Sequence, residues 1–378
     1  MQERTLLNRY LINLRPYMPV SQEIWSLPSE EWDNVLKLDW NESTIEPAPA
    51  VKKAVIDFVS SNDFFRLYPS TFNRKLIALL AQYAEVPEVN VQYFPSSDSL
   101  HEYIARLYIG VGDKVLILWP SYDNFRSTVE AAGADVVYSE LGSDFTFDPN
   151  VFEQDIVKER PKLAYICNPN NPTGTLILKD QIQKLIAENP ETMFLIDEAY
   201  AEFSGQSVND LALAYDNILV THTMSKAFGL ANIRFGYLVS SVNNIDAINR
   251  IRNSKNIQTI SQVAVISALE NAEYMRQYVE EVIQARKWFD QTLNDVEFPD
   301  IVKIYPSKSN FILIRCKDIN TRNKICYSLR EERIYVRQLS QCTSVLDCIR
   351  ITIGTRKQME TVYHVICRAM NKTEGKND

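Results

Sequence analysis

The chain has 378 residues, 46% of them hydrophobic, which is enough to bury a large core that we expect to be divided between two domains. Its net charge of −8 and its pI near 5.2 argue against a protein that binds nucleic acid. No apolar run approaches the length of a membrane span, and Met1-Gln2-Glu3-Arg4 does not open a signal peptide. We therefore expect a cytoplasmic protein with no membrane partner.

The residue types that bind transition metals are few and are not spaced for a site. The chain has three histidines and six cysteines, without a Cys-x-x-Cys pair or another metal-ligand spacing. We expect no metal site. Because no export signal is evident, we interpret the cysteines as reduced thiols that serve as small core residues.

Strand-like and helix-like segments alternate along most of the chain. Residues 1–38, rich in aromatic residues and prolines, are expected to form an arm that packs on the smaller domain or on a partner subunit. A large domain is predicted over 39–255 and a small α/β domain over 256–378, with a long helical stretch near 263–293. The alternation indicates a parallel or mostly parallel sheet. The predicted strands are 114–118, 135–138, 163–167, 193–196, 218–220, 236–239 and 310–314.

Polar residues follow three consecutive predicted strands at the points where these strands end. The first leads into Asn168-Pro169-Asn170-Asn171-Pro172-Thr173-Gly174, and the second into Asp197-Glu198-Ala199-Tyr200. The third lies just before Thr223-Met224-Ser225-Lys226-Ala227-Phe228. Because ligands bind beyond the carboxyl ends of strands in open α/β sheets, we expect these side chains to meet at one edge.

Lys226 stands in a hydroxyl-rich turn, and Arg234 follows eight residues later. An arginine beside hydroxyl groups suits a phosphate, and a lysine in a dry pocket can act as a nucleophile toward a carbonyl group. This pattern favours a lysine that forms a Schiff base with pyridoxal phosphate. A Ser-Lys pair before a helix is by itself usually a solvated turn, so the other motifs are needed for this interpretation.

The order of the motifs and the residues within them resemble those of the fold-type I, aspartate-aminotransferase-like superfamily of pyridoxal-phosphate enzymes. Within it, the chain is most similar to the histidinol-phosphate aminotransferase branch, from about Leu38 to Gly354. The resemblance implies an α/β fold with a mostly parallel central sheet in a large domain and a smaller α/β domain. It also implies pyridoxal 5′-phosphate as the cofactor.

The resemblance assigns roles to the residues of the three motifs. Lys226 would hold the cofactor and move a proton at the substrate α-carbon. Asp197 would face the pyridine nitrogen and favour its protonated form, while Glu198 should point away. Asn171 and Tyr200 would hydrogen-bond the phenolic oxygen. The alternatives without a catalytic role are that Asn171 is only a turn residue and that Asp197 is only a helix N-cap.

Other matches concern the cofactor's phosphate and ring. Arg234, Thr223 and Ser225 would bind the phosphate, and Tyr122 would stack on the ring; local turn bonding and plain core packing are the alternatives. The family's phosphate turn normally reads Gly-Ser-Asp-Glu, whereas this chain has Ser96-Ser97-Asp98-Ser99. A serine can replace that glycine if the backbone does not need a positive φ. We keep Ser96, Ser97 and Asp98 as phosphate contacts, with weakened cofactor affinity as the consequence to test.

The substrate end of the site departs most from a histidine-pathway enzyme. Arg350 matches the superfamily's carboxylate-binding arginine, and Arg337 matches an arginine that the histidinol-phosphate branch uses for a substrate phosphate. Asn41 matches an asparagine that enters the site, but the usual Pro-Tyr-Gly-Pro after it is replaced by Ser43-Thr44-Ile45-Glu46-Pro47. Tyr68 matches a tyrosine lent to the partner's cofactor phosphate, which implies a homodimer.

Three functions remain open from the sequence. The first is a transaminase that moves an amino group from a small donor such as glutamate to a phosphorylated or otherwise anionic oxo acceptor. The second is a decarboxylase of an amino-acid phosphate, because threonine-phosphate decarboxylase resembles the same branch. The third is a non-catalytic fold relative, against which the intact Lys226, Asp197, Tyr200 and Arg234 argue.

Overall fold

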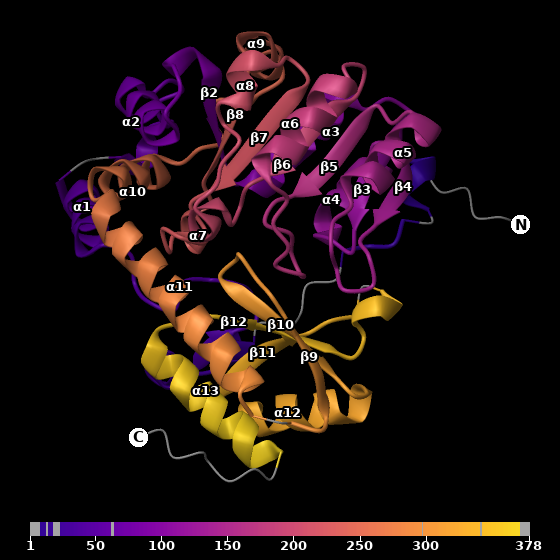
Figure 1. Ribbon diagram of the computed structural model, residues 1–378. Helices are drawn as coiled ribbons and strands as arrows, with labels where there is room; N and C mark the ends of the chain where they lie inside the picture. The colour runs from indigo at the N-terminus through magenta and orange to yellow at the C-terminus, as the bar shows by residue number, and fades with distance from the viewer. Residues whose placement is uncertain are drawn as a thin grey trace, which may run out of the picture.

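A seven-stranded, mostly parallel sheet forms the larger part of the computed structural model, which describes residues 8–12, 14–17, 23–61, 64–296, 298–340 and 342–370 (Figure 1). Within it only β8 runs antiparallel to its neighbours among the described strands. The central strands are buried along almost their whole length, as expected for a sheet with helices on both faces. In sheet order the strands are β2 (Val91–Phe94), β8 (Gly236–Ser240), β7 (Ile218–Thr223), β6 (Met193–Asp197), β5 (Leu163–Cys167), β3 (Lys114–Trp119) and β4 (Asp135–Glu140).

Helices connect these strands and cover the sheet. Most of the parallel strands are followed by a helix that returns the chain to the start of the next strand, which is the usual parallel crossover. The strand β7 instead leads through a loop and a short 3₁₀ turn into the antiparallel strand β8. No helix among the described residues is long and apolar enough to cross a membrane. The helices of this part are α3 (Ser97–Tyr108), α4 (Asp123–Ala131), α5 (Pro149–Glu159), α6 (Lys179–Glu188), α7 (Ala201–Ser204), α8 (Leu211–Ala214) and α9 (Val242–Asn249).

A five-stranded sheet forms the smaller part, below the first sheet in Figure 1. The strand β1 comes from the N-terminal region and pairs in parallel with β11, almost 300 residues later, so both chain ends contribute to this sheet. The two domain boundaries proposed from the sequence stay predictions. The elements are β1 (Leu36–Leu38), β11 (Ile334–Gln338), β12 (Cys348–Thr352), β10 (Phe311–Cys316), β9 (Ile301–Tyr305), α12 (Ile319–Glu331) and α13 (Arg356–Ala369).

Four further helices join the two parts. The helix α10 (Thr259–Glu270) packs on α1 (Pro49–Ser61) and α2 (Arg74–Ala84), and α11 (Ala272–Asn294) runs from there to the smaller sheet (Figure 1). The helical stretch predicted near 263–293 is therefore two helices that meet at Asn271. The side-chain amide of Asn271 donates to the Ser267 carbonyl oxygen, a local bond that competes with helix continuation.

Short 3₁₀ segments complete the described elements. Three of them belong to the region before β1, which the sequence assigns to an arm, and one lies between α1 and α2. Their ranges are η1 (Arg9–Leu11), η2 (Glu23–Ser26), η3 (Ser29–Asn34), η4 (Phe64–Arg66), η5 (Glu88–Asn90), η6 (Ala231–Ile233) and η7 (Thr343–Val345).

The parallel strands β2, β3, β5, β6 and β7 all end at the same edge of the larger sheet. The pairs Cys167–Asp197 and Asp197–Thr221 are in register, so the segments after β5, β6 and β7 leave the sheet side by side. The meeting of the three predicted motifs at one edge is thus a direct consequence of strand direction. This edge faces the smaller sheet.

Candidate active site

A cavity of about 730 Å³ lies at the carboxyl ends of the parallel strands and reaches the strands β11 and β12 of the smaller sheet. It contains thirteen of the fifteen predicted site residues. Ser96 and Tyr68 are outside it, and the roles that the resemblance implies for all fifteen stay predictions. The thirteen are Asn41, Ser97, Asp98, Tyr122, Asn171, Asp197, Tyr200, Thr223, Ser225, Lys226, Arg234, Arg337 and Arg350.

Lys226 lies in the loop after β7 with its amine inside the cavity. Its Nζ donates to the carbonyl oxygen of Trp40 at 2.8 Å and lies 6.0 Å from the centroid of the Tyr200 ring. Burial lowers the pKa of this amine to about 8. The negative charge of Glu42 opposes this shift, and the positive charge of Arg350 adds to it. About a tenth of Lys226 is therefore unprotonated near neutral pH, far more than for a lysine with the ordinary pKa, and the unprotonated amine is the nucleophilic form.

Asp197 ends β6 and is 3% exposed. The Tyr165 hydroxyl donates to its Oδ2 at 2.9 Å, and the backbone N–H of Ala199 donates to its Oδ1 at 3.2 Å. Burial raises the pKa of Asp197, while these hydrogen bonds and the nearby His101 oppose that rise. Glu198 points elsewhere, as expected, because its carboxylate accepts hydrogen bonds from Ser207 and Val208.

Tyr200 lies at the centre of a hydrogen-bond network. The side-chain amides of Asn41 and Asn171 donate to its hydroxyl oxygen at 3.0 and 3.3 Å. Arg350 in turn donates to Asn171 Oδ1 at 2.7 Å and to the Asp39 carbonyl oxygen at 2.6 Å. Because the Tyr200 oxygen accepts both amides, its own proton remains available for an acceptor in the cavity.

The turn before α3 has a backbone conformation that corrects one expectation. Ser96 has φ 102° and ψ 158°, a region that is almost reserved for glycine, so the condition under which serine replaces glycine without strain is not met. Its hydroxyl is not directed at the cavity but caps α3 by accepting the backbone N–H of Ser99 at 3.1 Å. A Cβ at Gly236 would stand 2.6 Å from the Ser97 nitrogen, so β8 can approach this turn only with glycine there.

Polar groups converge beyond this turn. The guanidinium of Arg234 lies 3.5 Å from the Asp98 carboxylate, which also accepts the Tyr122 hydroxyl at 3.1 Å. The hydroxyl of Thr223 donates to Ser225 Oγ at 2.8 Å. The two hydroxyls thus make the local turn bonds that were the alternative to phosphate binding, although both also line the cavity. The amides at the α3 N-terminus and the arginine fit an anion.

The N-terminal region contributes a residue that the sequence did not indicate. Tyr17 lines the cavity, half-buried, with its ring edge-on to Tyr122 at 5.9 Å, and its phenol faces Arg337 and Arg350. Arg15 nearby pairs with Asp123 at 3.0 Å. In the sequence, Tyr17 was only one aromatic residue of the arm, and no local motif distinguishes it from the others.

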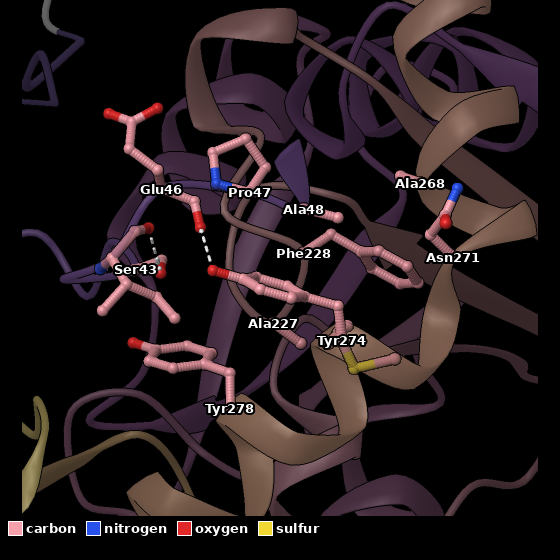
Figure 2. Close-up of a pocket in the computed structure, with 12 residues that line it drawn as sticks. Ser43, Glu46, Pro47, Ala48, Ala227, Phe228, Ala268, Asn271, Tyr274 and Tyr278 are labelled. Atoms are coloured by element: carbon pink, nitrogen blue, oxygen red, sulfur yellow. Dashed lines mark hydrogen bonds between the residues drawn. The ribbon is translucent and has the colours of Figure 1, made fainter. Parts of the chain in front are cut away.

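The segment that replaces the usual Pro-Tyr-Gly-Pro packs beside Lys226 without entering the cavity. Figure 2 shows Ser43 and Glu46 against Ala227 and Phe228 and against two tyrosines of α11. The Tyr274 hydroxyl donates to the Glu46 carbonyl oxygen at 3.3 Å. The departure in this segment therefore affects how the Lys226 loop is supported rather than the cavity wall.

The family follows from comparison with known proteins. The model of the family "Aminotransferase class I and II" matches residues 33–366. The chain belongs to this family. It is 39% identical to the dihydroxyacetone phosphate transaminase of Campylobacter jejuni, over 97% of this chain and 98% of that one. It is 35% identical to the histidinol-phosphate aminotransferase of Ruminiclostridium cellulolyticum, over 85% and 89%.

Solved structures agree in fold. The histidinol-phosphate aminotransferase of Sinorhizobium meliloti in complex with pyridoxal-5′-phosphate has a TM-score of 0.81, with 24% identity over 94% of this chain and 98% of that one. The enzyme of Clostridium acetobutylicum has a TM-score of 0.78, with 25% identity over 89% and 99%. The transaminase is thus an aspartate-aminotransferase-like, fold-type I enzyme that uses pyridoxal phosphate, as the sequence predicted.

The cavity fits this cofactor by the chemistry of its groups. When bound, pyridoxal phosphate supplies an electron-withdrawing ring that stabilises negative charge at the substrate α-carbon. The buried Asp197 carboxylate suits a cationic ring nitrogen, the buried Lys226 amine suits an aldehyde, and the α3 N-terminus with Arg234 suits a phosphate. Among the described residues, no group of three or more His, Cys, Asp or Glu side chains is arranged to hold a metal ion.

Ser96 provides the first prediction. Replacing Ser96 by glycine removes strain of about 1–3 kcal/mol, while the lost cap and the more flexible unfolded chain offset about 1 kcal/mol of this. We expect Ser96→Gly to raise the free energy of unfolding by about 1 kcal/mol in chemical denaturation of the cofactor-free protein. Ser96→Ala keeps the strain and loses the cap, so it should lower that free energy by about 1 kcal/mol. A glycine variant less stable than wild type would contradict the strain.

The pKa of Lys226 gives a second prediction. The rate at which the cofactor-free protein attaches pyridoxal phosphate covalently should rise about tenfold per pH unit below pH 8, because the free amine increases with pH. It should level off above the pKa of about 8. Stopped-flow absorption measures this rate, and Lys226→Ala should show no covalent attachment. A rate still rising tenfold per unit at pH 10 would contradict the proposed effect of burial.

Proposed function

We propose that this transaminase transfers the amino group of a donor such as glutamate to a small phosphorylated ketone of the dihydroxyacetone phosphate type. The observation that carries the proposal is a pair of guanidinium groups in the same cavity as Lys226. Arg337 of β11 and Arg350 of β12 are register partners on adjacent strands, and both line that cavity. The similarity to the Campylobacter jejuni transaminase over nearly the whole chain supports the same substrate class.

The two arginines form a site for an anion. Among the described residues, no carboxylate lies within 4 Å of either guanidinium. Burial lowers the pKa of Arg350 to about 10 and also lowers that of Arg337, so each cation has lost hydration without gaining an anionic partner. A phosphate or carboxylate that enters the cavity would restore this balance, and paired guanidinium groups favour a doubly charged phosphate.

The arm limits the space at this end of the cavity. Tyr17 lines the cavity together with the two arginines, and the carbonyl oxygen of Arg15 accepts a hydrogen bond from the buried Arg126 at 2.9 Å. Arg126 is itself held by Asp123 and Glu130. An anchored aromatic wall of this kind favours a compact acceptor over one with a ring substituent.

Different residues of the cavity would have different roles in the reaction. Arg337 and Arg350 would bind the acceptor's phosphate and the donor's carboxylate in turn. Lys226 Nζ, partly unprotonated and held by the Trp40 carbonyl, would take and return the proton at the substrate α-carbon. Tyr200, with two amides on its oxygen, would donate its proton toward the cofactor's phenolic oxygen.

The acceptor can be tested with the purified protein and its cofactor. We expect glutamate to bleach the visible absorption of bound pyridoxal phosphate and dihydroxyacetone phosphate to restore it. The oxo form of histidinol phosphate should restore it at least tenfold less efficiently in kcat/KM, the size of effect a single pocket contact gives. Equal efficiency would contradict the small-acceptor proposal. Release of carbon dioxide from an amino-acid phosphate, without transamination, would favour the decarboxylase instead.

A substitution of Arg337 tests phosphate recognition separately from catalysis in the same assay. Arg337→Gln removes a charged hydrogen bond worth about 1.5–3 kcal/mol, which corresponds to a KM for the phosphorylated acceptor about 10- to 150-fold higher. The rate of bleaching by glutamate should change much less. Arg368→Gln, at an exposed arginine paired with Glu332, is the matched control and should leave both steps unchanged. An unchanged KM in Arg337→Gln would remove Arg337 from the site.

We also propose that the enzyme works as a homodimer in which Tyr68 reaches the partner's cofactor phosphate. The segment between α1 and α2 presents large apolar side chains to solvent, with Phe65 82%, Leu67 62%, Tyr68 83% and Phe72 57% exposed. An exposed apolar group of this size is typical of an interaction surface. Tyr68 lies outside its own cavity, which supports a contribution to a second one.

Sedimentation velocity tests the dimer. The wild-type protein should sediment at twice the 43.5 kDa of one chain. Leu67→Asp should shift it toward the monomer, because a charge at the centre of an apolar interface is costly. Tyr68→Phe should stay dimeric and bind pyridoxal phosphate about tenfold more weakly, having lost one hydrogen bond to a charged group. Val157→Asp, at a similarly exposed apolar position on α5, is the control and should not change the mass.

A further inference from the structure

His101 lies directly behind Asp197, on the side away from the cavity. It belongs to α3, the same helix whose N-terminus borders the predicted phosphate site, and it is 1% exposed. Its Nε2 lies 3.2 Å from Thr221 Oγ1 and 3.9 Å from Asp197 Oδ2. Because Asp197 and Thr221 are register partners on β6 and β7, one imidazole faces both side chains.

Aromatic packing fixes the orientation of this imidazole. Its ring stands edge-on to Phe125 at 5.4 Å and to Tyr165 at 5.9 Å, and these two rings stack on each other at 4.4 Å. Tyr165 also donates its hydroxyl to Asp197 Oδ2. The ring thus cannot turn away from Asp197 without disturbing a second side chain that holds the same oxygen.

The partners of the two ring nitrogens identify the tautomer. Nδ1 is buried and has no hydrogen-bond partner among the described residues. A proton on Nδ1 would leave a buried N–H unsatisfied, which costs more than an unpaired lone pair at a ring nitrogen. The neutral form of His101 that fits this geometry is therefore the Nε2–H tautomer, whose N–H dipole points toward Thr221 Oγ1 and the Asp197 carboxylate.

The Asp197 carboxylate needs this support. It is buried, and the carboxylate of Asp98 repels its negative charge. Further titratable groups that interact with it are Tyr165, Cys167, Glu198 and Tyr200. Burial alone would favour the neutral acid, which could not stabilise a positive ring nitrogen. Among the described residues, the groups that favour its charged form before the cofactor arrives are the Tyr165 hydroxyl and the Ala199 N–H, which donate to it, and the His101 N–H dipole 3.9 Å away.

We propose that His101 is a positioning residue, which holds Asp197 as an oriented carboxylate and thereby strengthens its contact with the ring nitrogen of pyridoxal phosphate. It acts through Asp197 and touches neither cofactor nor substrate. The proposal concerns cofactor binding and ring electronics, so it does not depend on which acceptor the enzyme uses.

Two substitutions of His101 by side chains of similar length separate the loss of the N–H donor from the loss of side-chain volume. His101→Gln keeps an N–H near the position of Nε2, whereas His101→Met fills the space without a donor. In full-length, cofactor-free protein, infrared difference spectra against Asp197→Asn give the Asp197 titration. That subtraction is needed because Glu198 and Glu202 are also buried carboxyls, with pKa values raised by burial to about 8 and about 7.

We expect the Asp197 titration midpoint to rise by about one pH unit in His101→Met and by less in His101→Gln. The dissociation constant of pyridoxal phosphate at neutral pH should increase about tenfold in His101→Met and be restored in large part in His101→Gln. His222→Met is the matched control, since His222 is the neighbouring residue to Thr221 on β7, 4% exposed, and bonded to Asn209 instead. Its Asp197 titration should equal that of wild type.

Equal shifts in His101→Met and His222→Met would overturn the proposal, because they would show a general effect of losing a buried histidine. If His101→Met does not fold, nitrogen-15 spectra of wild-type protein decide the matter, since the chain has three histidines. An Nε2-protonated neutral His101 supports the proposal. An imidazolium or an Nδ1-protonated ring would overturn it, because neither agrees with the unpartnered Nδ1.

Discussion

Desolvation of charged side chains around one cavity is the constraint on which the rest of this structure depends. Burial has removed water from Lys226, Asp197 and Arg350. It lowers the pKa of Lys226 and Arg350 and raises that of Asp197, so it favours the neutral form of each. Among the described residues, none of the three has a partner of opposite charge that neutralises it fully. The cavity thus holds an incomplete set of charges, which, in the roles proposed for these residues, the ring nitrogen of the cofactor and the anionic groups of its substrates would complete.

The two sheets carry different members of this set. The larger sheet supplies Asp197 and Lys226 from the ends of adjacent parallel strands, where register fixes their separation. The smaller sheet supplies Arg337 and Arg350 from adjacent antiparallel strands, and β1 brings Asp39 and Asn41 to the same place. The network from Asn41 through Tyr200 and Asn171 to Arg350 crosses between the two parts. The residue proposed to contact the cofactor's hydroxyl and the arginine proposed to bind the substrate thus belong to one hydrogen-bond network.

The fold class and the cofactor could be predicted because the motifs resemble those of a known superfamily. Most of the cavity residues could be placed because each motif directly follows a strand. A motif that follows a strand can be located from periodicity, and strand direction then brings Asp197 and Lys226 together. Tyr17, His101 and the break at Asn271 were not predicted, for a common reason. Tyr17 acts on residues more than 300 positions away, and His101 lies on a helix face that looks like ordinary core in the sequence.

Among the described residues, seven non-glycine residues have a positive φ, and three of them border or line the cavity. Of the non-glycine residues with positive φ, Glu85 and Arg160 simply end helices, where a left-handed residue is normal. Asn41, Ser96 and Arg234 instead border or line the cavity, with φ values of 57°, 102° and 52°. Each is fixed by the surrounding structure, Ser96 by capping α3 and Asn41 by bonds to Tyr200 and Thr352. A serine is strained in this conformation where a glycine would not be. The close approach of β8, rather than the conformational preference of Ser96, therefore holds the turn in its geometry.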